Sequence, residues 1–189
     1  GAVVYNFFDN LLPDNEQIRS RIQARFHIPT KQPFDLLSRI GGDCVGAIQL
    51  YPEGDQVAPV TEIHAQPLGE KDIEQLLQGY KDAPLGMEAD IEDFRISLAG
   101  AQEKTALLWY RDQWHRPQGS TPTSHILKLP IGYIANNGID LSESVENEWL
   151  CLKIAEKFGF PVARSEIASF GAQKVLVVER FDRRWSQDG

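Results

Sequence analysis

The segment 94–105, Phe-Arg-Ile-Ser-Leu-Ala-Gly-Ala-Gln-Glu-Lys-Thr, contains residue types that could bind phosphate groups. The small side chains of Ala99, Gly100 and Ala101 would let backbone N–H groups approach an anion closely. Lys104 adds a cation beside that turn. The spacing differs from the Walker pattern, and a tight hairpin turn with a surface lysine is an equally good interpretation of this segment alone.

A second lysine, Lys128, lies in an apolar segment, Ser-His-Ile-Leu-Lys-Leu-Pro, that is typical of a strand. Its ammonium must reach solvent along the sheet or meet an anion, because burying it unpaired is costly. In kinases such a strand lysine contacts nucleotide phosphates and is held by a helix glutamate. The helix expected after Ser142 carries Glu146 and Glu148, and Glu148 is the candidate partner, although acidic residues in a first turn also stabilise the helix dipole.

A third feature is the segment 175–184, where an apolar strand runs directly into a charged stretch with one aromatic residue. Such a strand could present backbone groups to a nucleotide base, or it could simply leave the core for solvent. The order of these features is more informative than any one of them. Phosphate loop, strand lysine, helix glutamate and hinge strand follow one another in the amino-terminal lobe of a kinase.

The composition limits the classes of protein to which the chain can belong. It has 189 residues, 42% hydrophobic and 24% charged, which fits one soluble domain or two lobes. A net charge of −8 argues against a direct DNA-binding protein, and no apolar run is long enough to span a membrane. Cys44 and Cys151 are expected to be buried and reduced in a cytoplasmic protein, and no Cys/His cluster has metal-ligand spacing.

The hydrophobic periodicity predicts mainly helices in the first half of the chain and mainly strands in the second. The expected elements of the first half are helices at 14–26, 33–40 and 70–81, a strand at 45–51 and a loop at 52–68. Those of the second half are strands at 94–98, 106–110, 113–116, 125–129, 163–170 and 175–179, and a helix capped by Ser142 that ends near Gly159. This is an α+β arrangement, in which a helical amino-terminal subdomain (1–90) precedes a kinase-like lobe (91–189) with a mainly antiparallel sheet and one packed helix.

The residues of these segments resemble those of HipA-type serine/threonine kinases, the toxin kinases of bacterial toxin–antitoxin pairs. The motifs that carry the resemblance are Phe-Arg-Ile-Ser at 94–97, Ala-Gly-Ala-Gln-Glu-Lys-Thr at 99–105, His-Ile-Leu-Lys-Leu-Pro at 125–130 and Val-Glu-Arg-Phe-Asp-Arg-Arg at 178–184. Residues 6–13 and 32–37 also match the amino-terminal region of that family. The similarity covers nearly the whole chain, and its motifs are specific to this family rather than to kinases in general.

The resemblance implies roles in ATP binding for the matching residues. The loop over the phosphates comprises Ala99, Gly100, Ala101, Gln102, Glu103 and Lys104, and Lys128 contacts phosphate. The part of the chain that faces the adenine, called the hinge segment below, comprises Glu179, Arg180 and Phe181. Ser97 matches the serine that these kinases autophosphorylate, which silences them, and a phosphate charge of about −1.5 to −2 would repel a bound nucleotide.

The resemblance also implies partners, and it points to chemistry that is missing from this sequence. Family members use ATP and Mg²⁺, phosphorylate glutamyl-tRNA synthetase, promote persistence and bind a helix-turn-helix antitoxin (HipB-like) that contacts DNA. Their catalytic Asp-Gly-His-x-Lys-Asn motif and magnesium-binding aspartate do not occur here. We therefore expect part of a longer kinase, with no catalytic residue or metal ligand in this chain and no activity alone. Two other interpretations stay open: a non-catalytic module that binds an antitoxin or partner kinase, and an α+β domain that binds no nucleotide.

Overall fold

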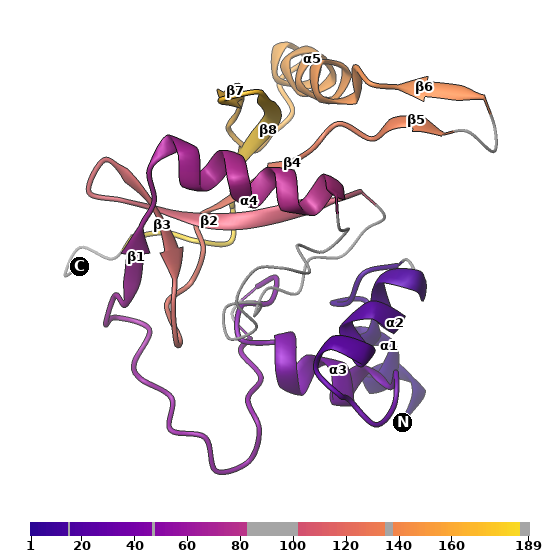
Figure 1. Ribbon diagram of the computed structural model, residues 1–189, viewed down its shortest axis with the longest axis vertical. Coiled ribbons are helices and arrows are strands. Elements are labelled where there is room, and N and C mark those ends of the chain that lie inside the picture. Colours follow the sequence, from indigo (N-terminus) through magenta and orange to yellow (C-terminus); the bar gives the residue numbers. More distant parts are fainter. Residues whose placement is uncertain (15, 47, 83–101, 135–137, 186–189) are drawn as a thin grey trace.

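The computed structural model of the protein describes residues 1–14, 16–46, 48–82, 102–134 and 138–185 (Figure 1). The helices are α1 (Ala2–Asp9), α2 (Glu16–Arg25), α3 (Pro33–Ile40), α4 (Glu70–Asp82) and α5 (Ser144–Lys157). The strands are β1 (Ala65–Pro67), β2 (Lys104–Tyr110), β3 (Gln113–Pro117), β4 (His125–Lys128), β5 (Gly132–Ile134), β6 (Ile139–Leu141), β7 (Ser165–Phe170) and β8 (Gln173–Glu179). The expected α+β class is confirmed.

The helices α1, α2 and α3 form a small group with a core of its own. α3 begins with a proline at its first position, where the missing N–H costs nothing, and it ends at Gly41. Its apolar residues Leu36, Leu37 and Ile40 are completely buried in a cluster that includes the apolar side of α2. The helices predicted at 14–26 and 33–40 are confirmed, with α2 shorter by a few residues.

The strand predicted at 45–51 is wrong, because the described residues of this segment form no strand. Gly46 has a φ of 81°, which lies outside the β region. Its N–H is bound by Asp182 and its carbonyl by Arg183, both just beyond the hinge segment. The N–H and the carbonyl of Gly46, which strand pairing would need, therefore bind residues far along the chain instead.

The second half of the chain forms a six-stranded sheet in the order β1-β3-β2-β4-β8-β7, in which every neighbouring pair is antiparallel. The predicted hairpin is confirmed as β2 and β3. Its two turn residues, Arg111 and Asp112, have φ angles of 50° and 59°, as a two-residue type I′ turn requires. A separate short hairpin, β5 and β6, was not predicted from the sequence.

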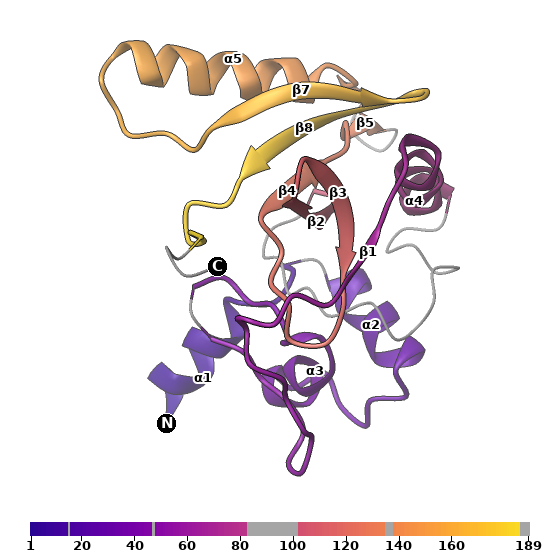
Figure 2. The ribbon, with the colours of Figure 1, turned by 90° about the vertical axis from the view of Figure 1, so that its left-hand side faces the viewer.

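Two helices pack on opposite faces of this sheet. Because side chains alternate along a strand, Leu127 and Lys128 of β4 point to opposite faces. Leu127 shares a buried cluster with Ile73 and Leu77 of α4, whereas Lys128 contacts α5. In Figure 2, α5 lies along β7 and β8, and the helices α1 to α3 lie beyond the other end of the sheet.

The packing of α4 and β1 ties residues 65–82 to the sheet rather than to the first three helices. β1 pairs with β3, and α4 supplies buried side chains to the core of the sheet. The division predicted between residues 90 and 91 lies outside the described residues, as does the strand predicted at 94–98. No helix within the described ranges is both long enough and apolar enough to cross a membrane.

The helix predicted after Ser142 is present, but its start and one of its residues differ from expectation. Ser142 does not cap the helix, because its hydroxyl donates to Asp140 and the N-cap position is Glu143. Cys151 is exposed on α5, so the prediction that it is buried is wrong, whereas Cys44 is buried as expected. Helical periodicity turns Cys151 away from the face of α5 that contacts the sheet.

Candidate functional site

Two lysines lie directly opposite each other on one face of the sheet. Lys104 of β2 and Lys128 of β4 are register partners, so their side chains leave the same face with Cβ atoms ~5 Å apart. Like charges in such a pair destabilise a sheet. On this face α5 supplies Glu148, whose Oε1 atom lies 2.5 Å from Lys128 Nζ. The ion pair suggested by the sequence is therefore present, and it lies beside a second cation.

Unlike Lys128, Lys104 forms no ion pair with a carboxylate of the described residues. Burial lowers the pKa of Lys104, and the neighbouring charge of Lys128 lowers it further. The carboxylates of Asp14, Glu148 and Glu103 act in the opposite direction but do not restore the ordinary pKa. A phosphate group close to both lysines would favour the charged form of each ammonium.

The structure distinguishes the two glutamates that the sequence placed near Lys128. Glu148 pairs with Lys128, while Glu146 Oε1 accepts a hydrogen bond from the ammonium of Lys174 on β8. That hydrogen bond lowers the pKa of Glu146. Two parallel Lys–Glu contacts thus attach α5 to the sheet, and one of them lies next to Lys104.

The start of β2 is held against the chain that follows β4. The Gln102 side-chain amide donates to the Leu129 carbonyl at 2.7 Å, and the Leu129 N–H donates to the Glu103 carbonyl at 3.2 Å. A cavity of about 330 Å³ adjoins this point, and its wall includes Gln102, Glu148 and Asn147. The remaining phosphate-loop residues Ala99, Gly100 and Ala101, and the candidate phosphorylation site Ser97, lie outside the described residues.

The backbone of the hinge segment is fixed on both sides. The Glu179 N–H donates to the Arg164 carbonyl and the Arg180 N–H donates to the Ser124 carbonyl, each at 2.9 Å. Within the described residues, the Phe181 N–H has no hydrogen-bond partner, and the Phe181 ring is 82% exposed. Phe181 therefore offers a free donor and an aromatic surface at the end of β8.

The Arg180 side chain is not available to a nucleotide, because it is buried in an ion-pair cluster. Its guanidinium donates to Asp43, Thr123, Asp182 and the Cys44 carbonyl over distances of 2.8 to 3.1 Å. Burial opposes ionisation of Asp182, but hydrogen bonds from Arg180 and from a backbone N–H outweigh burial and lower its pKa to about 2. Sequence reasoning missed Asp43, which lies 137 residues before Arg180 and belongs to no motif that would indicate this contact.

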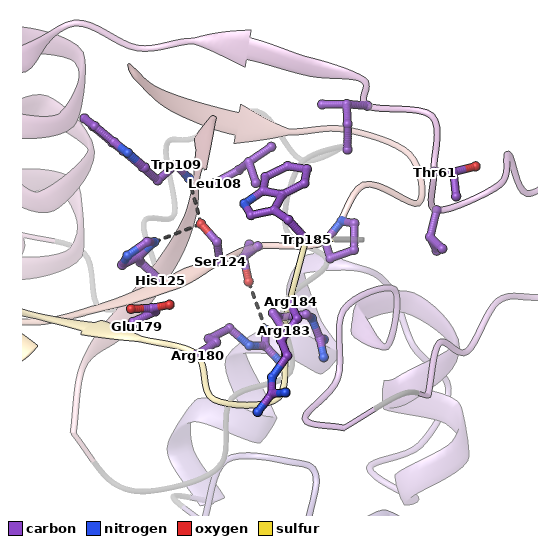
Figure 3. A pocket seen from close by; sticks show the side chains of 14 residues that line it. Thr61, Leu108, Trp109, Ser124, His125, Glu179, Arg180, Arg183, Arg184 and Trp185 are labelled. Carbon is purple, nitrogen blue, oxygen red and sulfur yellow. Dashed lines mark hydrogen bonds between the residues drawn. The ribbon is translucent and has the colours of Figure 1, made fainter. Parts of the chain in front are cut away.

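A larger cavity, of about 630 Å³, adjoins the hinge segment on another side (Figure 3). Its wall includes Trp109, Trp185, His125 and Glu179. His125 and Glu179 are register partners, and alternation along β4 places their side chains on the face opposite Lys128. Trp109 lines the same cavity, and the cavity and the lysine site therefore lie on different faces of the sheet.

These features define a class of protein: an α+β lobe in which a strand lysine on an antiparallel sheet pairs with a helix glutamate, as in the amino-terminal lobe of protein kinases. Sequence and structure comparisons agree. Residues 1–51 match the HipA N-terminal domain family, and residues 96–188 match the HipA-like C-terminal domain family. Both matches are to HipA domains, so the chain is a partial HipA-like protein.

Individual relatives show the extent of the match. The putative kinase Y4mE of Sinorhizobium fredii is 36% identical over 97% of this chain and 42% of its own length. The serine/threonine-protein kinase toxin HipA of Shewanella oneidensis is 31% identical over 94% of this chain and 38% of its own length. A solved complex of HipA, HipB and operator DNA from the same organism matches with a TM-score of 0.71 and 27% identity, over 98% of this chain and 40% of that one. The chain thus spans about two fifths of these relatives.

Proposed function

We propose that this chain provides the ATP-binding part of a HipA-type protein-serine/threonine kinase. The observation that carries the proposal is the cross-strand pair Lys104 and Lys128, with only Lys128 held by Glu148. An ion pair that only attached α5 to the sheet would need one lysine beside Glu148. The second cation, with its lowered pKa, is explained by an anionic ligand such as the phosphates of a nucleotide.

The rest of the nucleotide would lie along the same face of the sheet. The phosphate loop, Ala99 to Lys104, would cover the phosphates, and the hinge segment would face the adenine. Because the Arg180 side chain is buried, the hinge contacts would come from backbone groups such as the Phe181 N–H and from the Phe181 ring. Among the described residues no cluster of three His, Cys, Asp or Glu side chains could hold a metal ion. Mg²⁺ would be held by residues outside this chain, because the magnesium-binding aspartate of the family does not occur in this sequence.

The family suggests how such a kinase would be used in the cell. The solved relative is a complex with HipB and operator DNA. By analogy, a helix-turn-helix antitoxin would bind the parent protein and mediate its contact with DNA. Glutamyl-tRNA synthetase would be the cytoplasmic substrate, its phosphorylation would promote persistence, and Ser97 would be autophosphorylated. Without the catalytic motif, this chain alone would bind nucleotide but transfer no phosphate.

The lysine site can be tested by calorimetric titration of the protein with Mg-ATP. Lys128→Met should weaken binding by about 10- to 100-fold, because a hydrogen bond to a charged group contributes roughly 1.5–3 kcal/mol. Lys174→Met is the matched control, since Lys174 also contacts a glutamate of α5 but lies on β8. An unaltered affinity of Lys128→Met, or an equal loss in both variants, would refute the proposed phosphate site.

The alternative, a non-catalytic module, predicts a different result with the same protein. Such a module would bind antitoxin or a partner kinase equally well in the wild type and in Lys128→Met, and ATP would not affect that binding. Phosphorylation assays with radiolabelled ATP on the full-length parent protein separate the two possibilities. Incorporation that depends on Lys128 supports the kinase, and its complete absence supports the module.

A further inference from the structure

Asp43 connects the helical subdomain to the start of β4 and to the end of β8, where the hinge segment lies. It follows the glycines that end α3, and only 2% of its surface is exposed. One carboxylate oxygen accepts the Thr123 N–H at 3.0 Å, the Thr123 hydroxyl at 2.5 Å and Arg180 Nη1 at 3.1 Å. The other accepts Arg183 Nη2 at 2.7 Å. Thr123 comes just before β4, and Arg180 comes just after β8.

The contacts of Asp43 go beyond what is needed to neutralise one buried charge. Two arginines converge on the same short segment, because Arg180 and Arg183 also both donate to the carbonyl of Cys44, at 2.9 and 2.8 Å. The adjacent Asp182 closes the group by accepting from both guanidiniums. The end of β8 and the residues just after it are therefore held by the carboxylates of Asp43 and Asp182 and by the Cys44 carbonyl. The two backbone hydrogen bonds at Glu179 and Arg180 add to these contacts.

We propose that Asp43 is a positioning residue for nucleotide binding, through which the helical subdomain sets the geometry of the hinge segment. The inference rests on the proposed function. Arg180 lies between Glu179 and Phe181, whose backbone groups would meet the adenine. Tying Arg180 and Thr123 to one carboxylate fixes the end of β8 relative to the start of β4, the strand that carries Lys128. The adenine and phosphate contacts are thereby kept at a constant separation, which lowers the ordering cost of binding.

A consequence is that the helical subdomain and the nucleotide site are coupled. Anything that moves the end of α3 also moves the carboxylate that holds the hinge segment. A ligand that binds the helical subdomain would then change nucleotide affinity, and nucleotide would change the affinity of that ligand by the same factor. Asp43 would carry this coupling without touching the nucleotide.

The test compares ATP with inorganic tripolyphosphate in calorimetric titrations of the wild type, Asp43→Asn and a control. Asp43→Asn removes the charge and one acceptor oxygen but keeps the size. It should weaken ATP binding about tenfold, within the range usual for coupled sites, and leave tripolyphosphate binding unaltered. Asp9→Asn is the control, because it breaks an ion pair with Arg19 in the same subdomain that involves no residue of the hinge segment, and it should change neither affinity.

Each other outcome has a distinct meaning. Equal losses of ATP and tripolyphosphate binding in Asp43→Asn, or no loss of either in a folded variant, would overturn the positioning role. If Asp43→Asn unfolds, Thr123→Val replaces it. This variant deletes the contacts of the Thr123 hydroxyl with Asp43 and Arg180 and keeps the Asp43 charge, so it should weaken ATP binding in the same selective way. Equal losses of both ligands, or no loss, would again overturn the role. A wild-type protein that binds neither ligand would instead contradict the proposed function. Urea unfolding of each variant establishes that it is folded.

Discussion

Replacing Lys104 by methionine should make the ligand-free protein more stable while weakening ATP binding. Lys104 lies opposite Lys128 and is half-buried, and burial together with that second charge lowers its pKa. Methionine keeps the unbranched apolar stem and removes the ammonium. The Lys104 ammonium, which would bind a phosphate, therefore destabilises the protein when no ligand is bound.

The size of the gain follows from the geometry of the pair. Two unit charges ~7 Å apart repel by roughly 2 kcal/mol at an effective dielectric constant of ~20. Solvent screening of these partly exposed side chains, together with the attraction of Asp14, Glu148 and Glu103, reduces this to about 1 kcal/mol in the free energy of unfolding. Because the folded-state pKa of Lys104 is below its ordinary value of 10.5, the penalty is present at neutral pH. It disappears as the pH rises through the folded-state pKa toward 10.5, so the advantage of the variant should shrink with pH.

Urea unfolding at pH 7 and pH 10, followed by tryptophan fluorescence, measures this difference. Lys174→Met is the matched control, because its ammonium contacts Glu146 and its removal should bring no gain. In parallel, calorimetry should show about tenfold weaker ATP binding to Lys104→Met, the value for a loss of ~1.4 kcal/mol. A variant no more stable than the wild type at pH 7, or an advantage that grows with pH, would refute the reasoning.

Three further predictions concern α5, the hinge and the cysteines. Glu148→Gln should weaken ATP binding several-fold because Lys128 loses its anchor, whereas Glu146→Gln should leave it nearly unaltered; calorimetry measures both, and equal effects would contradict the assignment. The pKa of Asp182 is lowered to about 2. Its ionised carboxylate therefore stabilises the folded protein by about 2 kcal/mol, a contribution that is complete above pH 4 and is lost as the pH falls toward 2. Acid unfolding of Asp182→Asn should lack this part of the transition. A thiol reagent should modify exposed Cys151 in the native protein but Cys44, whose pKa burial raises to about 11, only after unfolding; two equally fast thiols would contradict this.

Much of the fold could be predicted because its signals are local. The apolar spacing of α3 and α4, the proline and glycine at the ends of α3, and the two turn residues of the β2–β3 hairpin are all properties of contiguous segments. The strand predicted at 45–51 failed for the opposite reason. Its apolar composition suits a strand, but contacts from Asp182 and Arg183, more than 130 residues away, determine the backbone at Gly46.

The sequence by itself determined the order of the site: a turn of small residues, a strand lysine, a helix with two glutamates and a strand that leads into charge. The tertiary structure alone decided that Lys104 lies opposite Lys128 and that Asp43 holds Arg180. It also confirmed Glu148, the candidate from the sequence, as the partner of Lys128. The physical reason is that strand register and helix rotation set these pairings. Both follow from packing between segments distant in the chain, whereas residue order is written in the chain itself.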